Sequence, residues 1–333
     1  MRTICTIVFL LVFHDIPTFA QAVRVTGTSV TMAPPSGFTA AQRFPGFERP
    51  DLQSSIMVTE LPAPADGLTR GMNAAGLASR GMTLISSSRP QIDGTPALLL
   101  HVSQTASGTL FLKWMLVVGD TKSSVMIVGT FPKSLEAQLS EPMKAAVLST
   151  RWRLSAAPNP NEGLPFKVTG TPALKIAGRV SNMLMLTESG KLGPQGPDFA
   201  LLAIGSSVAA IRIDDLKTFS EERARQTKQL KEITVSRGTS ITIDGNAAYE
   251  LVADGTDVAT GKAVTLYQVI MPRSGGYVLM QGMVTTVRAN AMVPEFRRVA
   301  ATFQGADRPR PGPVAWQGRG ITGGGEVIPS GAI

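Results

Sequence analysis

The chain has 333 residues, of which 43% are apolar and 17% are charged, and its formal net charge is +8. This length is enough for about two domains of ordinary size, so a single small disulfide-stapled module is excluded. The one cysteine and two histidines, Cys5, His14 and His101, leave few side chains for zinc binding or for acid–base chemistry near neutral pH. We therefore expect no metal and no cofactor.

Residues 1–22 predict a secretory signal peptide. Arg2 gives a positive start, residues 4–13 form an apolar core of ten residues, and the chain then reaches an A-x-A cleavage site that ends at Ala22. Ten apolar residues span only ~15 Å as a helix, about half of the hydrocarbon core of a bilayer, which disfavours a membrane anchor. We expect cleavage between Ala22 and Val23, and a periplasmic or secreted protein with no transmembrane anchor after cleavage.

Residues 23–154 predict a first domain that mixes strands and helices. A weak helical pattern covers residues 68–79. Residues 111–117 and 124–131 are apolar stretches on either side of a polar turn, which predicts a hairpin of largely buried strands. The next helix is expected to start near Glu141, because the proline that follows is tolerated only in a first helical turn.

Residues 166–304 predict a second domain with the same order of elements. A helix is expected over residues 214–231, with its charged residues on a solvated face. Residues 264–271 and 277–285 repeat the hairpin of the first domain. A helix with an early proline follows again, and its expected start is near Val293.

Two segments of different composition lie outside these domains. Residues 155–165, which read SAAPNPNEGLP, are typical of a linker. Residues 305–333 are rich in Gly and Pro and poor in aromatic residues, so we expect a disordered tail.

A repeat of ~150 residues relates the two domains. The Ile-Asp-Gly turn at residues 92–94 recurs at residues 243–245, and further matches follow after a two-residue insertion. A repeat of this length indicates a duplicated domain rather than a solenoid. The further matches are Gly108 with Gly261, Trp114 with Tyr267, Val125 with Val278, and Gly129 with Gly282. We expect the two aromatic residues to be equivalent and buried; the alternative is an exposed aromatic platform for a ligand.

Each domain resembles the Mog1/PsbP-like family. The resemblance rests on a strand that runs into a Pro-Gly-Phe turn at residues 30–38, on the Ile-Asp-Gly turn, and on Phe131-Pro132 before the closing helix. The second domain lacks the Pro-Gly-Phe turn and has Val284-Thr285 in place of Phe-Pro. The resemblance implies an α+β fold, in which helices sandwich an antiparallel sheet, and a role as a binding module.

No motif predicts a catalytic, cofactor or metal site. A G-x-G-x-x-G match at residues 318–323 lacks the strand and helix that a dinucleotide site needs. Asp93 and Asp244 precede glycine in duplicated turns, where aspartate is favoured for local hydrogen bonding. Asp214-Asp215 is explained by capping of a helix start, and His101 is expected to be structural.

These observations favour a non-catalytic exported binding or assembly protein. Its expected partner is an envelope protein or a small envelope ligand rather than nucleic acid, because basic residues are interleaved with acidic ones and form no run of five. The alternative is a carboxylate-dependent envelope hydrolase without metal or cysteine, which would need two carboxyl groups in one cleft. No sequence feature identifies the partner surface.

Overall fold

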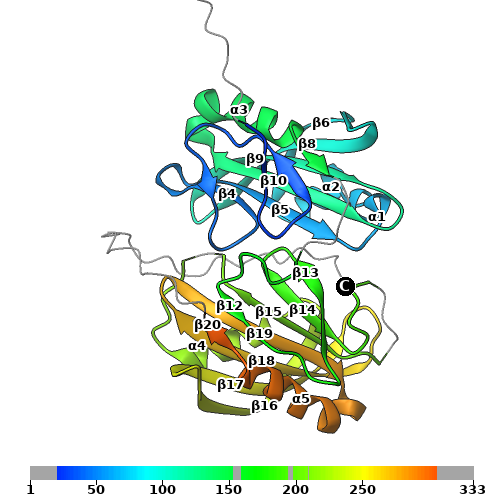
Figure 1. Ribbon diagram of the computed structural model, residues 1–333, viewed down its shortest axis with the longest axis vertical. Coiled ribbons are helices and arrows are strands. Elements are labelled where there is room, and N and C mark those ends of the chain that lie inside the picture. Colours follow the sequence, from blue (N-terminus) through cyan, green and yellow to red (C-terminus); the bar gives the residue numbers. More distant parts are fainter. Residues whose placement is uncertain (1–20, 153–158, 194–197, 209, 306–333) are drawn as a thin grey trace, which may run out of the picture.

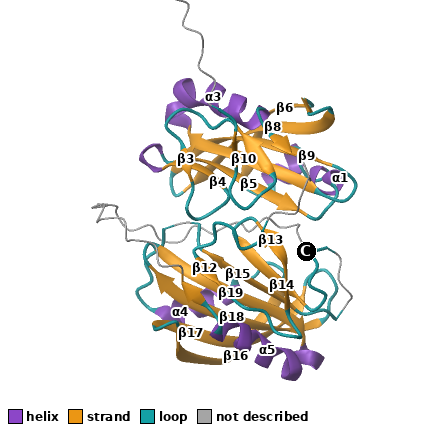
Figure 2. Ribbon diagram, viewed as in Figure 1, coloured by secondary structure: helices purple, strands orange, loops and turns teal. Residues whose placement is uncertain are grey.

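The structure of the protein is a computed structural model that describes residues 21–152, 159–193, 198–208 and 210–305. Two antiparallel sheets dominate it, one from residues 23–152, the N-terminal half, and one from residues 159–305, the C-terminal half (Figure 1). Helices lie against both sheets, which confirms the α+β fold class (Figure 2). None of the helices in these described ranges is long and apolar enough to cross a membrane.

Several predicted features lie outside the described residues. They are most of the signal peptide, part of the linker, nearly the whole tail and the G-x-G-x-x-G match.

The N-terminal sheet has the strand order β3-β4-β5-β10-β9-β8-β6, and all neighbouring pairs are antiparallel. Helix α3 packs on one face, against β9 and β10, whereas α1 and α2 lie on the other face. A small separate sheet has the order β1-β2-β11, and β7 pairs with β8. The elements of this half are β1 (Val23–Arg24), β2 (Val30–Met32), β3 (Thr39–Ala40), β4 (Gly46–Arg49), η1 (Pro50–Leu52), β5 (Ser54–Leu61), α1 (Ala65–Thr69), α2 (Ala74–Ala78), β6 (Met82–Ser88), β7 (Gln91–Ile92), β8 (Thr95–Ala106), β9 (Thr109–Gly119), β10 (Ser124–Pro132), η2 (Lys133–Leu135), α3 (Glu136–Leu148) and β11 (Arg151–Trp152).

The C-terminal sheet has the strand order β13-β14-β15-β19-β18-β17-β16 and is antiparallel throughout. Helix α5 covers one face, against β18 and β19, and α4 covers the other, against β16, β17 and β18. The elements of this half are β12 (Phe166–Lys167), β13 (Lys175–Val180), β14 (Met183–Thr187), β15 (Leu201–Ser206), α4 (Leu216–Arg225), β16 (Leu230–Ile243), β17 (Asn246–Asp257), β18 (Ala263–Arg273), β19 (Gly276–Thr285), η3 (Thr286–Arg288), α5 (Ala289–Ala301) and β20 (Gln304–Gly305).

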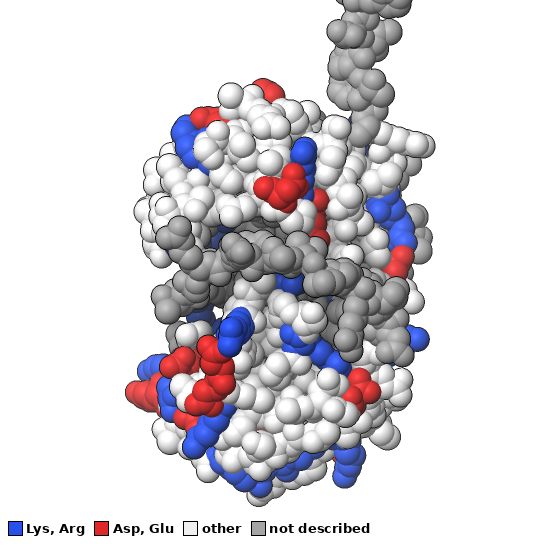
Figure 3. All heavy atoms as spheres, turned by 90° about the vertical axis from the view of Figure 1, so that its left-hand side faces the viewer, with Lys and Arg blue, Asp and Glu red and all other residues white. Residues whose placement is uncertain are grey.

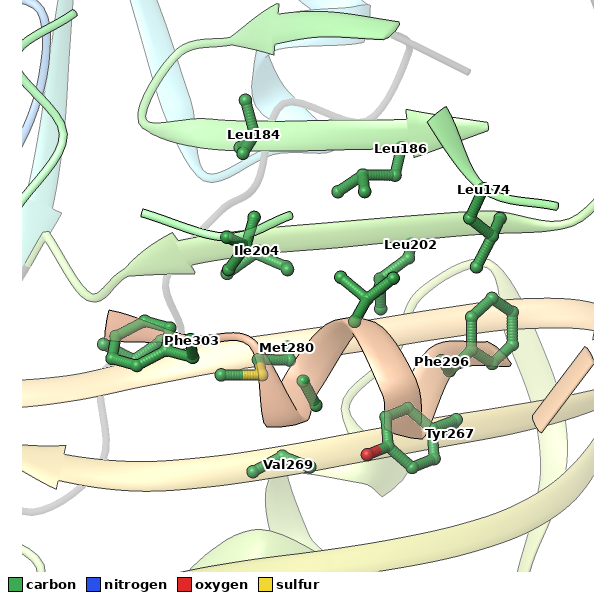
Figure 4. Packing of buried hydrophobic residues seen from close by; sticks show 14 of the residues in the cluster. Leu174, Leu184, Leu186, Leu202, Ile204, Tyr267, Val269, Met280, Phe296 and Phe303 are labelled. Carbon is green, nitrogen blue, oxygen red and sulfur yellow. The ribbon is translucent and has the colours of Figure 1, made fainter. Parts of the chain in front are cut away.

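Each sheet buries apolar residues on both faces, because successive side chains of a strand point to opposite sides. Beneath α5 the buried cluster includes Tyr267 and Phe296 (Figure 4), and beneath α4 it includes Leu266. In the N-terminal half, Phe131 lies in the cluster beneath α3 and Leu77 in the cluster beneath α1 and α2. Each large apolar side chain contributes about 1.5–3 kcal/mol on burial, as an upper estimate.

The sequence repeat is also present in the structure. Trp114 pairs with Gly129 across β9 and β10, and Tyr267 pairs with Gly282 across β18 and β19. Trp114 is 7% exposed and Tyr267 is fully buried, so the predicted burial of both aromatic residues at equivalent positions is confirmed. A Cβ on either glycine would overlap a side chain of the helix above it, so these glycines let α3 and α5 approach their sheets closely.

The predicted starts of the two closing helices were wrong. Helix α3 begins at Glu136 rather than near Glu141, and α5 begins at Ala289 rather than near Val293. Pro142 and Pro294 therefore lie inside their helices, where each removes one backbone hydrogen bond. Apolar residues before and after each proline are buried against the sheet, and this burial offsets the cost.

The predicted helix over residues 214–231 was too long. Helix α4 spans Leu216–Arg225, and Leu230 instead opens strand β16, opposite Asp257. The apolar spacing continued through Leu230 because a buried strand residue extended the helical pattern by chance. In the N-terminal half, residues 68–79 form parts of two short helices, α1 and α2, rather than one.

Candidate functional site

The aromatic residue beneath each closing helix lies beside a polar group. In the N-terminal half, His101 of β8 stacks on Trp114 of β9, with ring centroids 4.1 Å apart and ring planes 9° apart. Trp114 Nε1 donates a hydrogen bond to Ser140 Oγ at 3.3 Å, and Lys144 Nζ lies 5.2 Å from the Trp114 ring centroid. The histidine is therefore held between its strand and α3 by stacking rather than by an ion pair.

The His101 ring is poorly placed for acid–base chemistry. Its Nε2 atom is buried and has no hydrogen-bond partner among the described residues. Burial lowers the pKa of His101 from its ordinary value, Glu136 acts to raise this pKa, and Lys133 and Lys144 act to lower it. The imidazole is thus stabilised in its neutral form, as a structural histidine would be.

A buried carboxylate lies near Tyr267 in the C-terminal half, two residues before Val252, which pairs with Tyr267 as His101 pairs with Trp114. Glu250 of β17 is 7% exposed, and it faces Arg297 of α5. Arg297 Nε lies 2.9 Å from one Glu250 carboxylate oxygen and 3.1 Å from the other. Arg237 of β16 lies 3.9 Å from the same carboxylate. Both oxygens of Glu250 are therefore occupied by the guanidinium of Arg297.

Tyr267 completes this cluster from the middle of β18. Its ring stacks on Phe296 of α5 at 5.8 Å between centroids (Figure 4), and its hydroxyl is buried without a hydrogen bond of full geometry. Burial raises the pKa of the Tyr267 hydroxyl well above its ordinary range, and Glu250 adds to this rise. Burial likewise raises the pKa of the Glu250 carboxyl, while Tyr267 and Arg237 act to lower it.

This arrangement limits what Glu250 can do chemically. A general acid or base must reach a substrate proton, but the carboxylate oxygens already contact Arg297 beneath a helix. Its near neighbours are cationic and phenolic, whereas glycoside hydrolysis needs a second carboxyl group. The cluster is best explained as an internal ion pair that fixes α5 on the sheet.

The opposite face of the C-terminal sheet buries a second polar group. Gln268 is fully buried, and its Nε2 donates to the main-chain oxygen of Ser220 in α4 at 2.8 Å. Gln281 Nε2 donates to Gln268 Oε1 at 3.2 Å and to Thr227 Oγ1 at 3.0 Å. These hydrogen bonds satisfy the buried amide of Gln268 and anchor α4.

The two halves meet at a seam that includes Arg24, Met57, Glu162, Arg179 and Ser181. Glu162 forms an ion pair with Arg24. Arg179 Nη1 donates to the main-chain oxygen of Glu162, and Arg179 Nε donates to that of Ser181, both at 2.6 Å. Ser181 Oγ lies 3.8 Å from the Met57 sulfur. Burial lowers the pKa of Arg179 to about 10, against the effect of Glu162, so it stays charged at neutral pH.

The predicted turn and cap residues lie at the surface. Asp93 and Asp244 have positive φ values of 48° and 49°, each is followed by a glycine, and each pairs with an arginine at 3.0 and 3.2 Å. Asp215 caps α4 by accepting hydrogen bonds from two backbone N–H groups, whereas Asp214 pairs with Arg212 at 2.8 Å. The predicted turns and the capping by Asp215 are therefore confirmed, but the Asp244 carboxylate accepts from Gly305 N and Arg273 rather than from its own turn.

The described residues add little on the predicted cleavage site and on metal binding. Val23 opens β1 and pairs with Met32, and Ala22 precedes this strand. Within the described ranges, no three His, Cys, Asp or Glu side chains gather in a way that could hold a metal ion. On the face in Figure 3, most of the described surface is uncharged, and several small groups bring basic and acidic side chains side by side.

Sequence reasoning missed the buried charges. Glu250 and Lys113 both interrupt apolar strands, and a charged residue at such a position is rarely buried unless it is paired or functional. That signal could have singled them out. Arg297, the partner of Glu250, could not be found in this way, because arginines of helices are common on surfaces.

Comparison with known proteins gives structural likenesses alone. No protein-family model matches the chain, and no curated protein matches it. One similar solved structure is a Pseudomonas aeruginosa protein of unknown function, a putative regulator, at 20% identity and a TM-score of 0.29 over 39% of this chain and 83% of that one. Another is LpqN, involved in cell envelope biogenesis of Mycobacterium tuberculosis. It is 13% identical, with a TM-score of 0.30 over 43% of this chain and 83% of that one. The T6SS immunity protein TplEi of Pseudomonas aeruginosa is 11% identical, with a TM-score of 0.31 over 80% of this chain and 96% of that one.

Proposed function

We propose that the protein is a non-catalytic binding or assembly protein that acts outside the cytoplasm, in the periplasm or after secretion. In this proposal the signal peptide ends at Ala22, and two domains resembling the Mog1/PsbP-like family are joined by residues 155–165. The partner is an envelope protein or a small envelope ligand. The signal-peptide pattern and the repeated α+β scaffold support these statements.

The observation that favours a binding role over catalysis is that both carboxylate oxygens of Glu250 already have a partner. Glu250 is a buried carboxylate with a raised pKa, which is the usual mark of a catalytic acid. Yet both of its oxygens contact Arg297, and the Tyr267 hydroxyl lies against it. An acid held in this way serves the packing of α5.

The competing function is an envelope hydrolase that uses carboxylates. Two assays on the mature chain separate the two functions. The first measures the release of reducing ends from purified peptidoglycan by wild-type protein and by the Glu250→Gln variant. We expect no release by either protein. Release that disappears in Glu250→Gln would establish the hydrolase and overturn the proposal.

The second assay measures binding. Immobilised mature protein is exposed to periplasmic extract, each captured protein is purified, and the complex is then reconstituted and its stoichiometry measured by light scattering. We expect a complex of fixed stoichiometry that persists with Glu250→Gln, because that residue is internal. If neither captured proteins nor the small molecules of the extract form a saturable complex with the folded chain, the proposed function is wrong.

A further inference from the structure

Lys113 is a half-buried lysine that has no partner among the described residues. It lies on β9, between Leu112 and Trp114, which belong to the cluster beneath α3. Its side chain therefore belongs to the opposite face, the one that carries α1 and α2. None of the hydrogen bonds or ion pairs of the described residues includes its ammonium group, and burial lowers the pKa of Lys113 with no opposing partner.

Hydroxyl groups lie beside Lys113 on this face. The strand register places Thr130 of β10 directly opposite Lys113, and Ser55 of β5 directly opposite Thr130. Side chains opposite each other on neighbouring strands have Cβ atoms about 5 Å apart. Neither hydroxyl has a side-chain hydrogen bond within the described part of the chain. The three residues thus form a row of donors, called the Lys113 row.

The first carboxylate beyond the Lys113 row, on the next strand, is too distant to neutralise the lysine. Glu48 of β4 lies opposite Ser55, so three strand spacings, roughly 14 Å, separate its strand position from that of Lys113. On the other side, Lys113 pairs with Val102, which is buried in the cluster with Leu77 of α2. The charge is therefore partly desolvated by apolar neighbours and has no counter-charge in the described part of the chain.

The Lys113 row lies next to the seam. Met57, two residues beyond Ser55 on the same face of β5, contacts Ser181 of the C-terminal half, and β13 packs against β5. The seam also holds the buried guanidinium of Arg179, whose hydrogen-bond acceptors are neutral carbonyl groups. Glu162 is shared between Arg24 and Arg179. Positive charge therefore exceeds negative charge among these residues, which favours an anionic ligand.

We propose that Lys113, Thr130 and Ser55 bind the phosphate group of a small ligand at the edge of the seam. Lys113 supplies the positive charge, and the hydroxyls of Thr130 and Ser55 donate hydrogen bonds to phosphate oxygens. A bound phosphate provides the counter-charge that the half-buried ammonium lacks, and an unpaired buried charge is costly. The phosphate is that of a free phosphoryl compound or that of a lipid headgroup.

This inference rests on the proposed binding function and gives its ligand a chemical class. Isothermal titration of the mature chain uses two probes at matched ionic strength: inorganic phosphate and a water-soluble short-chain phosphatidic acid. We expect saturable binding of one phosphate group per chain. Binding of both probes with similar affinity indicates a free phosphate site, whereas much tighter binding of the lipid indicates a headgroup site.

Two variants and one control test the residues. Lys113→Met keeps the unbranched shape and most of the length of the side chain, removes the charge, and should weaken phosphate binding by about tenfold or more. Thr130→Val should weaken it by about threefold or more. Lys167→Met removes the same charge from an exposed residue of β12 and should leave binding unchanged. Near-ultraviolet circular dichroism verifies that each variant is folded.

The outcomes also separate this inference from the proposed function. Absence of saturable binding of either probe to the wild-type chain overturns the phosphate site, as does unchanged binding by folded Lys113→Met. In either case, a partner complex formed equally by wild-type and Lys113→Met leaves the binding function intact. A lysine that merely extends to solvent would give these negative results.

Discussion

Lys144 and Arg297 occupy the same place on the closing helices of the two halves, but Lys144 lies over the ring of Trp114 whereas Arg297 pairs with the carboxylate of Glu250. Lys144 Nζ lies 5.2 Å from the centroid of the Trp114 ring, while Arg297 makes an ion pair at 2.9 Å with Glu250. Both residues follow by one position the helix side chain that packs on the equivalent glycine. The repeated scaffold thus keeps a cation here and changes its partner.

Replacing one partner of the Glu250–Arg297 pair should destabilise the protein more than replacing both with apolar residues. Arg297→Met leaves a buried carboxylate and should lower the free energy of unfolding by about 3 kcal/mol, the lower end for such pairs, because Arg237 stays within 3.9 Å. The double variant Glu250→Leu with Arg297→Met should recover most of this loss. Urea unfolding measures both values. Arg298→Met, at an exposed position, is the control and should change stability by no more than about 0.5 kcal/mol.

If Glu250→Leu and Arg297→Met, measured singly, lower the free energy of unfolding by amounts that add up to the loss in the double variant, this prediction is contradicted. In that case the cluster would contribute through packing of α5 alone.

His101 should make stability depend on pH below neutrality. Burial lowers its pKa in the folded chain from 6.5, so below this pH the unfolded chain binds a proton that the folded chain resists. The contribution is therefore complete above the unfolded pKa and is lost as pH falls toward the folded pKa. His101→Phe keeps the ring stack on Trp114 and has no titrating group. As the pH is lowered from about 8 to about 5, the free energy of unfolding should fall less steeply for this variant than for the wild type. Parallel curves for the two proteins would show that His101 does not contribute.

The hairpins and the aromatic equivalence were predictable because they depend on local patterns. Alternation and turn residues locate β9 with β10 and β18 with β19, and a shared offset pairs Trp114 with Tyr267. The helix starts were not predictable, because the rule that proline occurs in the first turn gives way where an apolar face is buried, as around Pro142. The Glu250–Arg297 pair joins residues 47 positions apart, and only tertiary packing brings them together.

Signal cleavage should leave the small sheet intact. Val23 pairs with Met32 in β1 and β2, so cleavage after Ala22 retains both strands. We expect N-terminal sequencing of the mature protein, isolated from the periplasm, to begin at Val23. Recovery of chains with Met1 in a membrane fraction would contradict the predicted signal peptide.

Each half should fold by itself when the chain is cut between residues 155 and 158. This cut leaves Leu164 and Phe166 in the C-terminal fragment, where both belong to the core beneath α5. The N-terminal fragment keeps the complete cluster beneath α3 and loses the Arg24–Glu162 ion pair, which is partly exposed and contributes little. Each fragment should unfold cooperatively by heat and by urea. If neither does, the proposed division into two domains is wrong.

Trp114→Ala should destabilise the N-terminal half without abolishing a binding surface. Trp114 is 7% exposed, stacks on His101 and donates to Ser140, so truncation removes packing, stacking and a hydrogen bond. The expected loss is about 3–5 kcal/mol, as for other buried aromatic residues. In the separated halves, this variant should lower the melting temperature of the N-terminal fragment, and Tyr267→Ala should lower that of the C-terminal fragment. A Trp114→Ala protein that keeps its melting temperature but loses a reconstituted partner would instead identify this strand as the binding surface.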